Sequence, residues 1–192
     1  MKISFVSIED GITALGFRKM ASFARSIHPS TEVCYLPLTN AYNPLRFLFK
    51  PGEHDRVYSD ADLNSIASHF AKSDLVCFSS MTAYSDLTKE IIQLTKKINP
   101  KTYIIWGGIH PIVHPEDAIE YPDAICVGEG ETAFKLFLSS FKEGGDYTTT
   151  KNFWFNHNGK VIRNDFLPLH TSEEMDQFPF LLYADNELIF KH

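Results

Sequence analysis

Residues 106–117, WGGIHPIVHPED, contain the side chains that are best suited by type and spacing to chemistry. His110 and His114 stand four residues apart, with carboxylates directly behind them. Two histidines at this spacing can bind zinc from one face of a helix, but Pro111 and Pro115 argue against a continuous helix through both. We therefore expect no metal site here. The glycine pair before His110 indicates either close approach of a ligand to the backbone or the geometry of a strand exit.

A second glycine-containing motif, GEGETA at residues 128–133, matches the G-x-G-x-x-A pattern of dinucleotide-binding loops. It follows the last strand-like run rather than the first, and it would place Glu129 and Glu131 where a pyrophosphate binds. The two carboxylates would repel that ligand. Either a tight turn whose glutamates favour the N-terminal helix dipole, or contact with a neutral, hydroxyl-rich ligand edge, fits these residues better.

The elements that must position these motifs alternate between strands and helices. Five short apolar runs predict strands, and the segments between and after them have helical spacing. The predicted strands are residues 2–8, 31–38, 74–80, 102–108 and 123–129, and the predicted helices are 14–27, 60–71, 85–98, 115–121 and 131–142. Strands that are apolar on both faces imply a parallel sheet with right-handed crossovers. The expected fold class is a doubly wound α/β domain, Rossmann-like or flavodoxin-like, with a five-stranded parallel sheet.

Three further segments depart from this alternation. Residues 40–58 are interpreted as an insertion, over a sheet edge or the ligand crevice, within a domain of residues 1–145. Asn158 and Gly159 lie between two alternating apolar runs and predict a type I′ turn, so an appended β-hairpin is expected over 146–165. Residues 166–192 have no regular period and are expected to form a linker or tail.

Composition and charge narrow the function classes. The chain has 192 residues, of which 44% are hydrophobic and 22% charged, as is typical of a globular protein. Its net charge of −6 and lack of clustered basic residues argue against nucleic-acid binding. Cys34, Cys77 and Cys126 stand far apart in apolar runs, which indicates reduced, buried thiols. The apolar N-terminal run is too short for a signal peptide or membrane span. A cytoplasmic protein that binds neither nucleic acid nor membrane is expected.

In an open α/β sheet the ligand binds beyond the carboxyl ends of the strands, so loops 9–16, 79–84, 107–114 and 128–131 should converge. Glu9 would suit a response-regulator receiver, but Ser79 and Gly128 stand where that class needs an Asp and a Lys. A flavin phosphate loop is poorly matched by EDGITALG, and a hydrolase or transferase using the histidines lacks a nucleophile. Few charges, several hydroxyls and paired glycines predict instead a bulky, mostly uncharged cofactor.

Residues 106–137, WGGIHPIVHPEDAIEYPDAICVGEGETAFKLF, together with 152–165, NFWFNHNGKVIRND, resemble the N-terminal cobalamin-binding domain of cobalamin-dependent radical S-adenosylmethionine (SAM) enzymes. The resemblance covers roughly residues 2–180 and is most specific over 106–131. The stretch TALGFRKMASFAR resembles the family's first helix, and PLHTSEEMDQFPF resembles its linker toward the catalytic barrel.

The wider cobalamin-binding fold has a three-part signature, D-x-H-x-x-G, S-x-L and G-G, whose histidine ligates cobalt. Here Ile12 stands in the histidine position, Ser79-Ser80-Met81 stands in for the second part, and Gly107-Gly108 matches the third. The lack of this histidine is similar to what the radical SAM branch shows. Cobalamin binds there base-off, with its own benzimidazole displaced from cobalt. The resemblance therefore implies base-off cobalamin without a protein histidine on cobalt.

The resemblance also implies which residues would contact the cofactor. The nucleotide tail would pass Ser79 and the glycine pair, the corrin and its amides would meet the loops after strands three to five, and the lower face would lie near Ile12. The implied cofactor-binding residues are Ile12, Thr13, Leu15, Ser79, Ser80, Met81, Thr82, Tyr84, Gly107, Gly108, Ile109, His110, Gly128, Glu129, Gly130 and Glu131. No catalytic residue and no protein metal ligand is expected.

Radical SAM chemistry requires a CxxxCxxC triplet to hold an iron–sulfur cluster, and this chain has none. We therefore expect a domain that binds methylcobalamin or hydroxocobalamin and does not catalyse alone. SAM and the iron–sulfur cluster would belong to a radical SAM catalytic domain, in cis in a missing barrel or in trans, for methyl transfer or a related radical reaction. The alternative is a degenerate, cofactor-free protein-interaction module. An exposed docking face could also make the isolated domain a homodimer.

Overall fold

The computed structural model describes residues 1–9, 14–38, 58–157, 159–181, 183 and 186–190. Ile12, Thr13, Asn158 and all but the last residue of the predicted insertion 40–58 lie outside the described residues. Within the described residues, no helix combines the length and the apolar character needed to cross a membrane.

The described residues form one eight-stranded sheet in the order β7-β6-β5-β4-β3-β1-β2-β8. Its strands are β1 (Ile3–Ile8), β2 (Glu32–Tyr35), β3 (Leu75–Ser80), β4 (Tyr103–Gly107), β5 (Ala124–Cys126), β6 (Phe153–His157), β7 (Lys160–Arg163) and β8 (Leu188–Ile189). Strands β1 to β5 pair in parallel in the order β2-β1-β3-β4-β5, which confirms the predicted five-stranded parallel sheet of a doubly wound fold. The connection changes direction between β1 and β3, and ligands bind at such switch points.

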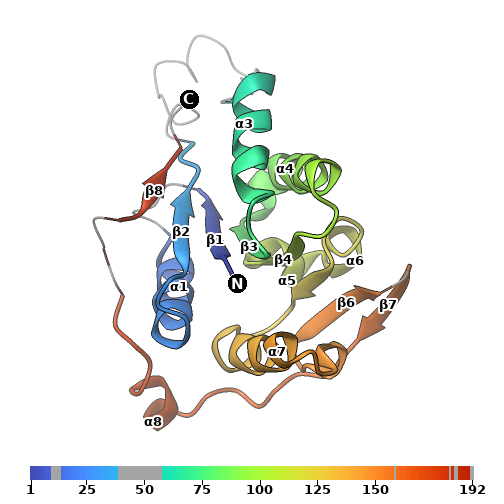
Figure 1. Ribbon diagram of the computed structural model, residues 1–192. Coiled ribbons are helices and arrows are strands. Elements are labelled where there is room, and N and C mark those ends of the chain that lie inside the picture. Colours follow the sequence, from blue (N-terminus) through green and yellow to red (C-terminus); the bar gives the residue numbers. More distant parts are fainter. Residues whose placement is uncertain (10–13, 39–57, 158, 182, 184–185, 191–192) are drawn as a thin grey trace.

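Helices cover both faces of the sheet (Figure 1). The long helices are α1 (Leu15–Ile27), α3 (Asp60–Phe70), α4 (Ser85–Ile98) and α7 (Glu131–Glu143), and the short ones are η2 (Thr82–Tyr84), α5 (Ile109–Val113), α6 (Pro115–Ala118), η3 (Tyr147–Thr149) and α8 (Ser172–Met175). One core lies between the sheet and α1 and α7, and it includes Phe5, Phe17 and Phe134. The second core lies between the other face and α3 and α4.

The region after β4 differs from the expected loop, because α5 begins there and the predicted helix 115–121 shortens to α6. Pro111 is the third residue of α5, and Pro115 is the first of α6, where a missing N–H breaks no helical hydrogen bond. His114 between them has φ −128° and ψ 59°, which is not helical. No single helix therefore carries His110 and His114, as the two prolines predicted.

The hairpin and the tail both join the main sheet. Strand β6 pairs antiparallel with β5, with Phe155 opposite Ala124, and β7 completes the edge. The tail runs past α7 and α1, and β8 then pairs in parallel with β2 at the opposite edge (Figure 1). The hairpin was expected, but the strand from the tail was not, because a two-residue strand has no periodicity of its own.

A partly buried ion pair fastens this tail to α1. Arg18 is 7% exposed, and its Nη1 lies 3.2 Å from Oε1 of Glu187, just before β8. The guanidinium carbon lies 4.7 Å from the ring centre of Tyr35 and 4.1 Å from that of Tyr183. Because the carboxylate is mostly shielded from water, its attraction to Arg18 is weakly screened.

Replacing Glu187 by glutamine is expected to lower the free energy of unfolding by about 1–3 kcal/mol, because the buried guanidinium loses the negative charge of Glu187. Urea denaturation followed by circular dichroism measures the change. The matched control is Glu116→Gln, which breaks the exposed pair with Arg163 and should cost less than about 1 kcal/mol. Equal losses in the two variants would contradict a stabilising role for the tail contact.

Candidate cofactor-binding site

A cavity of about 430 Å³ opens at the carboxyl edge of the sheet, beside the β1/β3 switch point. Its floor comes from strand residues on the α1/α7 face, and its sides come from the two helices. The apolar and sulfur-bearing lining residues include Phe5, Cys77, Ile105, Cys126 and Phe153 from the sheet and Phe17, Met20 and Phe134 from the helices. The cavity therefore suits an apolar, ring-shaped group more than a charged one.

Ten of the predicted cofactor-binding residues line this cavity: Leu15, Ser79, Ser80, Met81, Gly107, Gly108, Ile109, Gly128, Gly130 and Glu131. They come from α1, from the last residues of β3 and β4, and from the segments that follow β3, β4 and β5, which the parallel sheet brings to one edge. Loops distant in sequence thus converge as the fold predicted. Leu15, Met81 and Ile109 are 55%, 47% and 52% exposed and give the mouth an apolar rim.

Four other predicted residues do not line the cavity. Thr82 and Tyr84 belong to η2, which leads into α4 on the opposite face of the sheet. Glu129 instead accepts hydrogen bonds from His170: its Oε2 lies 2.7 Å from Nδ1 and 3.2 Å from the backbone N. His110 also turns away from the cavity.

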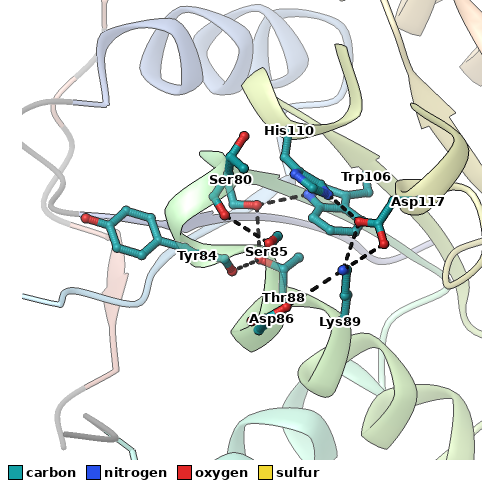
Figure 2. Close-up of polar contacts among 10 residues, drawn as sticks. Ser80, Tyr84, Ser85, Asp86, Thr88, Lys89, Trp106, His110 and Asp117 are labelled. Atoms are coloured by element: carbon teal, nitrogen blue, oxygen red, sulfur yellow. Dashed lines mark hydrogen bonds and ion pairs between the residues drawn. The ribbon is translucent and has the colours of Figure 1, made fainter. Parts of the chain in front are cut away.

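His110 packs in a polar network behind the cavity (Figure 2). Its ring stacks on Trp106 with 4.8 Å between centres, and its Nε2 lies 2.9 Å from Oδ2 of Asp117. The hydrogen bond from Lys89 is the main cause of a lowered pKa for Asp117, with His110 adding to it and burial opposing it. His110 therefore has a structural partner on the face opposite the cavity.

Ser80 connects this network to the cavity edge. Its Oγ accepts hydrogen bonds from Nε1 of Trp106 at 2.9 Å and from Oγ1 of Thr88 at 3.0 Å (Figure 2). The hydroxyl therefore holds the ends of β3 and β4 and the start of α4 together. Ser79, the preceding residue, points to the cavity face because side chains alternate along a strand.

The two glycines after β4 have different roles. Gly108 has φ 91°, and a Cβ there would lie 2.7 Å from the carbonyl oxygen of Ser80, so the backbone of β3 already fills that space. A Cβ at Gly107 would instead lie 3.7 Å from Cβ of Cys126, an ordinary contact beside the cavity. Gly108 thus serves the strand exit, whereas Gly107 leaves the cavity open.

Two thiols and one carboxylate that line the cavity are neutral or paired. Burial raises the pKa of Cys126 to about 11 and raises that of Cys77 well above its ordinary value, so neither thiol is a nucleophile at neutral pH. Glu131 is 8% exposed, and its Oε1 lies 3.0 Å from Nζ of Lys19. Ser7 Oγ on β1 is fully buried, does not line the cavity, and has no hydrogen-bond partner within the described part of the chain.

Sequence reasoning missed the apolar walls of the cavity. Phe5, Cys77 and Ile105 have the residue types of ordinary core positions, and burial alone does not distinguish a wall from a packed interior. A usable signal is the strand period, because Ile105 lies two residues before Gly107 and therefore on the same face. Only the position of the covering helices shows that space remains above that face.

The sequence of this chain is similar to a known domain family and to a known protein. Residues 53–138 match the family model of the B12 binding domain. An uncharacterized methyltransferase, PH0819 of Pyrococcus horikoshii, is 27% identical over 134 residues, which are 67% of this chain and 29% of that protein. The family-model match supports the predicted resemblance to a cobalamin-binding domain, and the sequence is similar to part of that methyltransferase.

Solved structures of cobalamin-dependent radical SAM enzymes have the same fold. The methyltransferase TsrM from Kitasatospora setae, with cobalamin and a [4Fe-4S] cluster bound, gives a TM-score of 0.58 at 15% identity, covering 91% of this chain and 30% of that one. OxsB with aqua-cobalamin gives 0.57 at 16% identity, covering 86% and 22%. This chain therefore spans less than a third of the length of each of these relatives.

Proposed function

We propose that this chain binds cobalamin base-off, with the nucleotide tail in the cavity and the corrin over its apolar rim. The cavity at the β1/β3 switch point carries the proposal, and the B12-binding match over residues 53–138 supports the choice of ligand. Its volume of about 430 Å³ lies within the range of about 300–1,000 Å³ that holds a drug-sized group. A whole corrinoid is larger, so only its tail would enter.

The residues present fit such a tail. Phe5, Ile105 and Phe134 would pack against the planar base, and Gly107 leaves the space that a Cβ and longer side chain would occupy. Ser79 lines the cavity, and its hydroxyl is available to polar groups of the tail. Cobalamin supplies cobalt–carbon chemistry when bound, whereas this chain supplies binding and orientation.

The absence of a protein imidazole on cobalt is part of the proposal. No histidine is among the described residues that line the cavity, and His110 is bonded to Asp117 on the opposite face. The position that the signature reserves for histidine holds Ile12, which lies outside the described residues. Cobalamin bound here would have neither its own base nor a side-chain imidazole from these residues below the cobalt.

Titration of the purified chain with hydroxocobalamin and methylcobalamin tests this function. Absorbance is expected to shift to the base-off form, one cobalt per chain should remain after desalting, and the midpoint of thermal unfolding should rise with ligand concentration. Corrinoid that leaves on desalting and does not change the thermal midpoint would contradict the proposal.

We further propose that a radical SAM catalytic domain acts with this chain, in cis or in trans, in methyl transfer or a related radical reaction. Support comes from relatives in which a similar region is only 22–30% of a longer chain. SAM and the iron–sulfur cluster would be held by that domain, because this sequence has no CxxxCxxC triplet. Affinity capture with the cobalamin-loaded chain, followed by iron analysis, should recover an iron–sulfur protein.

Exposed side chains of the tail favour the interaction-module alternative. Phe180 is 95% exposed, Leu169 80% and Phe166 63%, so their apolar side chains are available to a partner. If the chain retains no corrinoid yet captures the same partner, the module function is favoured. Sedimentation measurements distinguish a partner of another kind from a homodimer of this chain.

A further inference from the structure

Glu32, Cys34 and His69 form a cluster on the α3/α4 side of the sheet. Their ligand atoms all lie within 4.8 Å of one another. Oε2 of Glu32 lies 2.8 Å from Nε2 of His69 and 3.7 Å from Sγ of Cys34. Glu32 and His69 are 21% and 27% exposed by side chain, whereas Cys34 is fully buried, so the cluster is open to solvent on one side.

We propose that these three residues bind a divalent zinc-type cation, independently of the cobalamin site. Thiolate, imidazole and carboxylate are the three ligand types that zinc uses in proteins, with bond lengths of about 2.0–2.3 Å. Tetrahedral angles then place the ligand atoms roughly 3.3–3.7 Å apart. The Sγ–Oε2 separation of 3.7 Å already fits, and the 2.8 Å contact between Nε2 and Oε2 must open by less than about 1 Å.

The surroundings of the cluster suit a bound cation. The Ser4 hydroxyl donates to Oε2 of Glu32 at 2.9 Å, which orients the carboxylate from outside the ligand set. The Lys2 ammonium lies 3.7 Å from Oε1, but its side chain is 39% exposed and can turn into water. Binding replaces the thiol proton of Cys34, which passes to solvent, so a dication and two anionic ligands leave the cluster neutral.

The position of the cluster separates it from the cofactor cavity. Glu32 pairs in register with Ser4 at the start of β1, while the cavity lies beyond the carboxyl ends of the strands and on the other face. Glu32 and His69 are 37 residues apart in sequence. A cation bound to both residues would cross-link the two ends of the long connection between β2 and α3. Such a cross-link lowers the conformational entropy of the unfolded chain.

The test uses the full chain prepared without corrinoid and stripped of metal. Addition of Co²⁺ should produce a thiolate-to-cobalt charge-transfer band, and addition of Zn²⁺ should give one zinc per chain and raise the midpoint of thermal unfolding. Cys34→Ser and His69→Gln should each weaken zinc binding by more than about 100-fold. Ser4→Ala keeps all three ligands and should weaken it by about tenfold.

Two matched controls make the outcome decisive. Cys126→Ser removes a different buried thiol, and His157→Gln removes an exposed histidine on β6, so both should keep the band and the zinc affinity of the wild type. The proposal is overturned if the band is missing in the wild-type chain, or if it survives in Cys34→Ser. Zinc retained equally by His69→Gln and His157→Gln would show binding elsewhere and would also overturn it.

Discussion

A Gly107→Leu chain is expected to fold as the wild type does and to lose cobalamin binding by about 100-fold or more. A Cβ at this position meets nothing closer than 3.7 Å, and Gly107 does not have a positive φ, so the backbone accepts a side chain. The leucine would occupy the cavity beside Cys126, and the nucleotide tail would then clash with it. Retained cobalt after desalting and the base-off absorbance shift measure the loss.

The matched control for this variant is Gly145→Leu. Gly145 follows α7, its added Cβ would lie 3.5 Å from the Ser140 carbonyl oxygen, and it does not line the cavity. This chain should bind cobalamin as the wild type does. Circular dichroism and urea denaturation should show that both leucine variants are folded. Undiminished binding by a folded Gly107→Leu chain would remove the cavity from the proposed cofactor site.

Gly108→Ala, one residue further along, is expected to lower the free energy of unfolding by about 2–5 kcal/mol. Two costs combine, because φ is 91° and the new Cβ would lie 2.7 Å and 2.8 Å from backbone atoms of Ser80. Neither atom can move without disturbing the end of β3, where the Ser80 hydroxyl also bonds Trp106. Urea denaturation of the cofactor-free chain measures this effect separately from ligand binding.

Gly16→Ala provides the glycine-to-alanine control. Gly16 lies in α1, has nothing within 4 Å of an added Cβ, and does not have a positive φ. Alanine in a helix is favoured over glycine by roughly 0.5–1 kcal/mol, so stability should stay the same or rise slightly. If Gly108→Ala were as stable as Gly16→Ala, this result would contradict the close packing of Gly108 against the end of β3.

The glycine pair shows how far the residue pattern could define the site. Its place after an apolar strand predicted that it would lie at the ligand edge, and the structure puts it there. The pattern could not separate Gly107 from Gly108, because that depends on the distance to β3, a strand about thirty residues earlier in the chain. Gly107 is therefore the position at which an added side chain tests cofactor binding.

His110 shows the opposite case. The resemblance implied a cofactor contact for this histidine, but its ring stacks on Trp106 from the short helix α5. The decisive partner, Asp117, lies in α6, and Lys89 joins it from α4. The orientation of the His110 ring depends on the packing of α4, α5 and α6, so local sequence could not predict it.

The sequence alone determined the alternation of strands and helices, the parallel core and the hairpin, because strand and helix periods are local properties of neighbouring residues. It also identified the loops at the carboxyl edge, since parallel strands bring their ends together. Only the tertiary structure decided the cavity walls, the direction of His110, the pairing of β8 with β2 and the Glu32–Cys34–His69 cluster. Each of these depends on contacts between residues far apart in the chain, and such contacts leave no periodic signal.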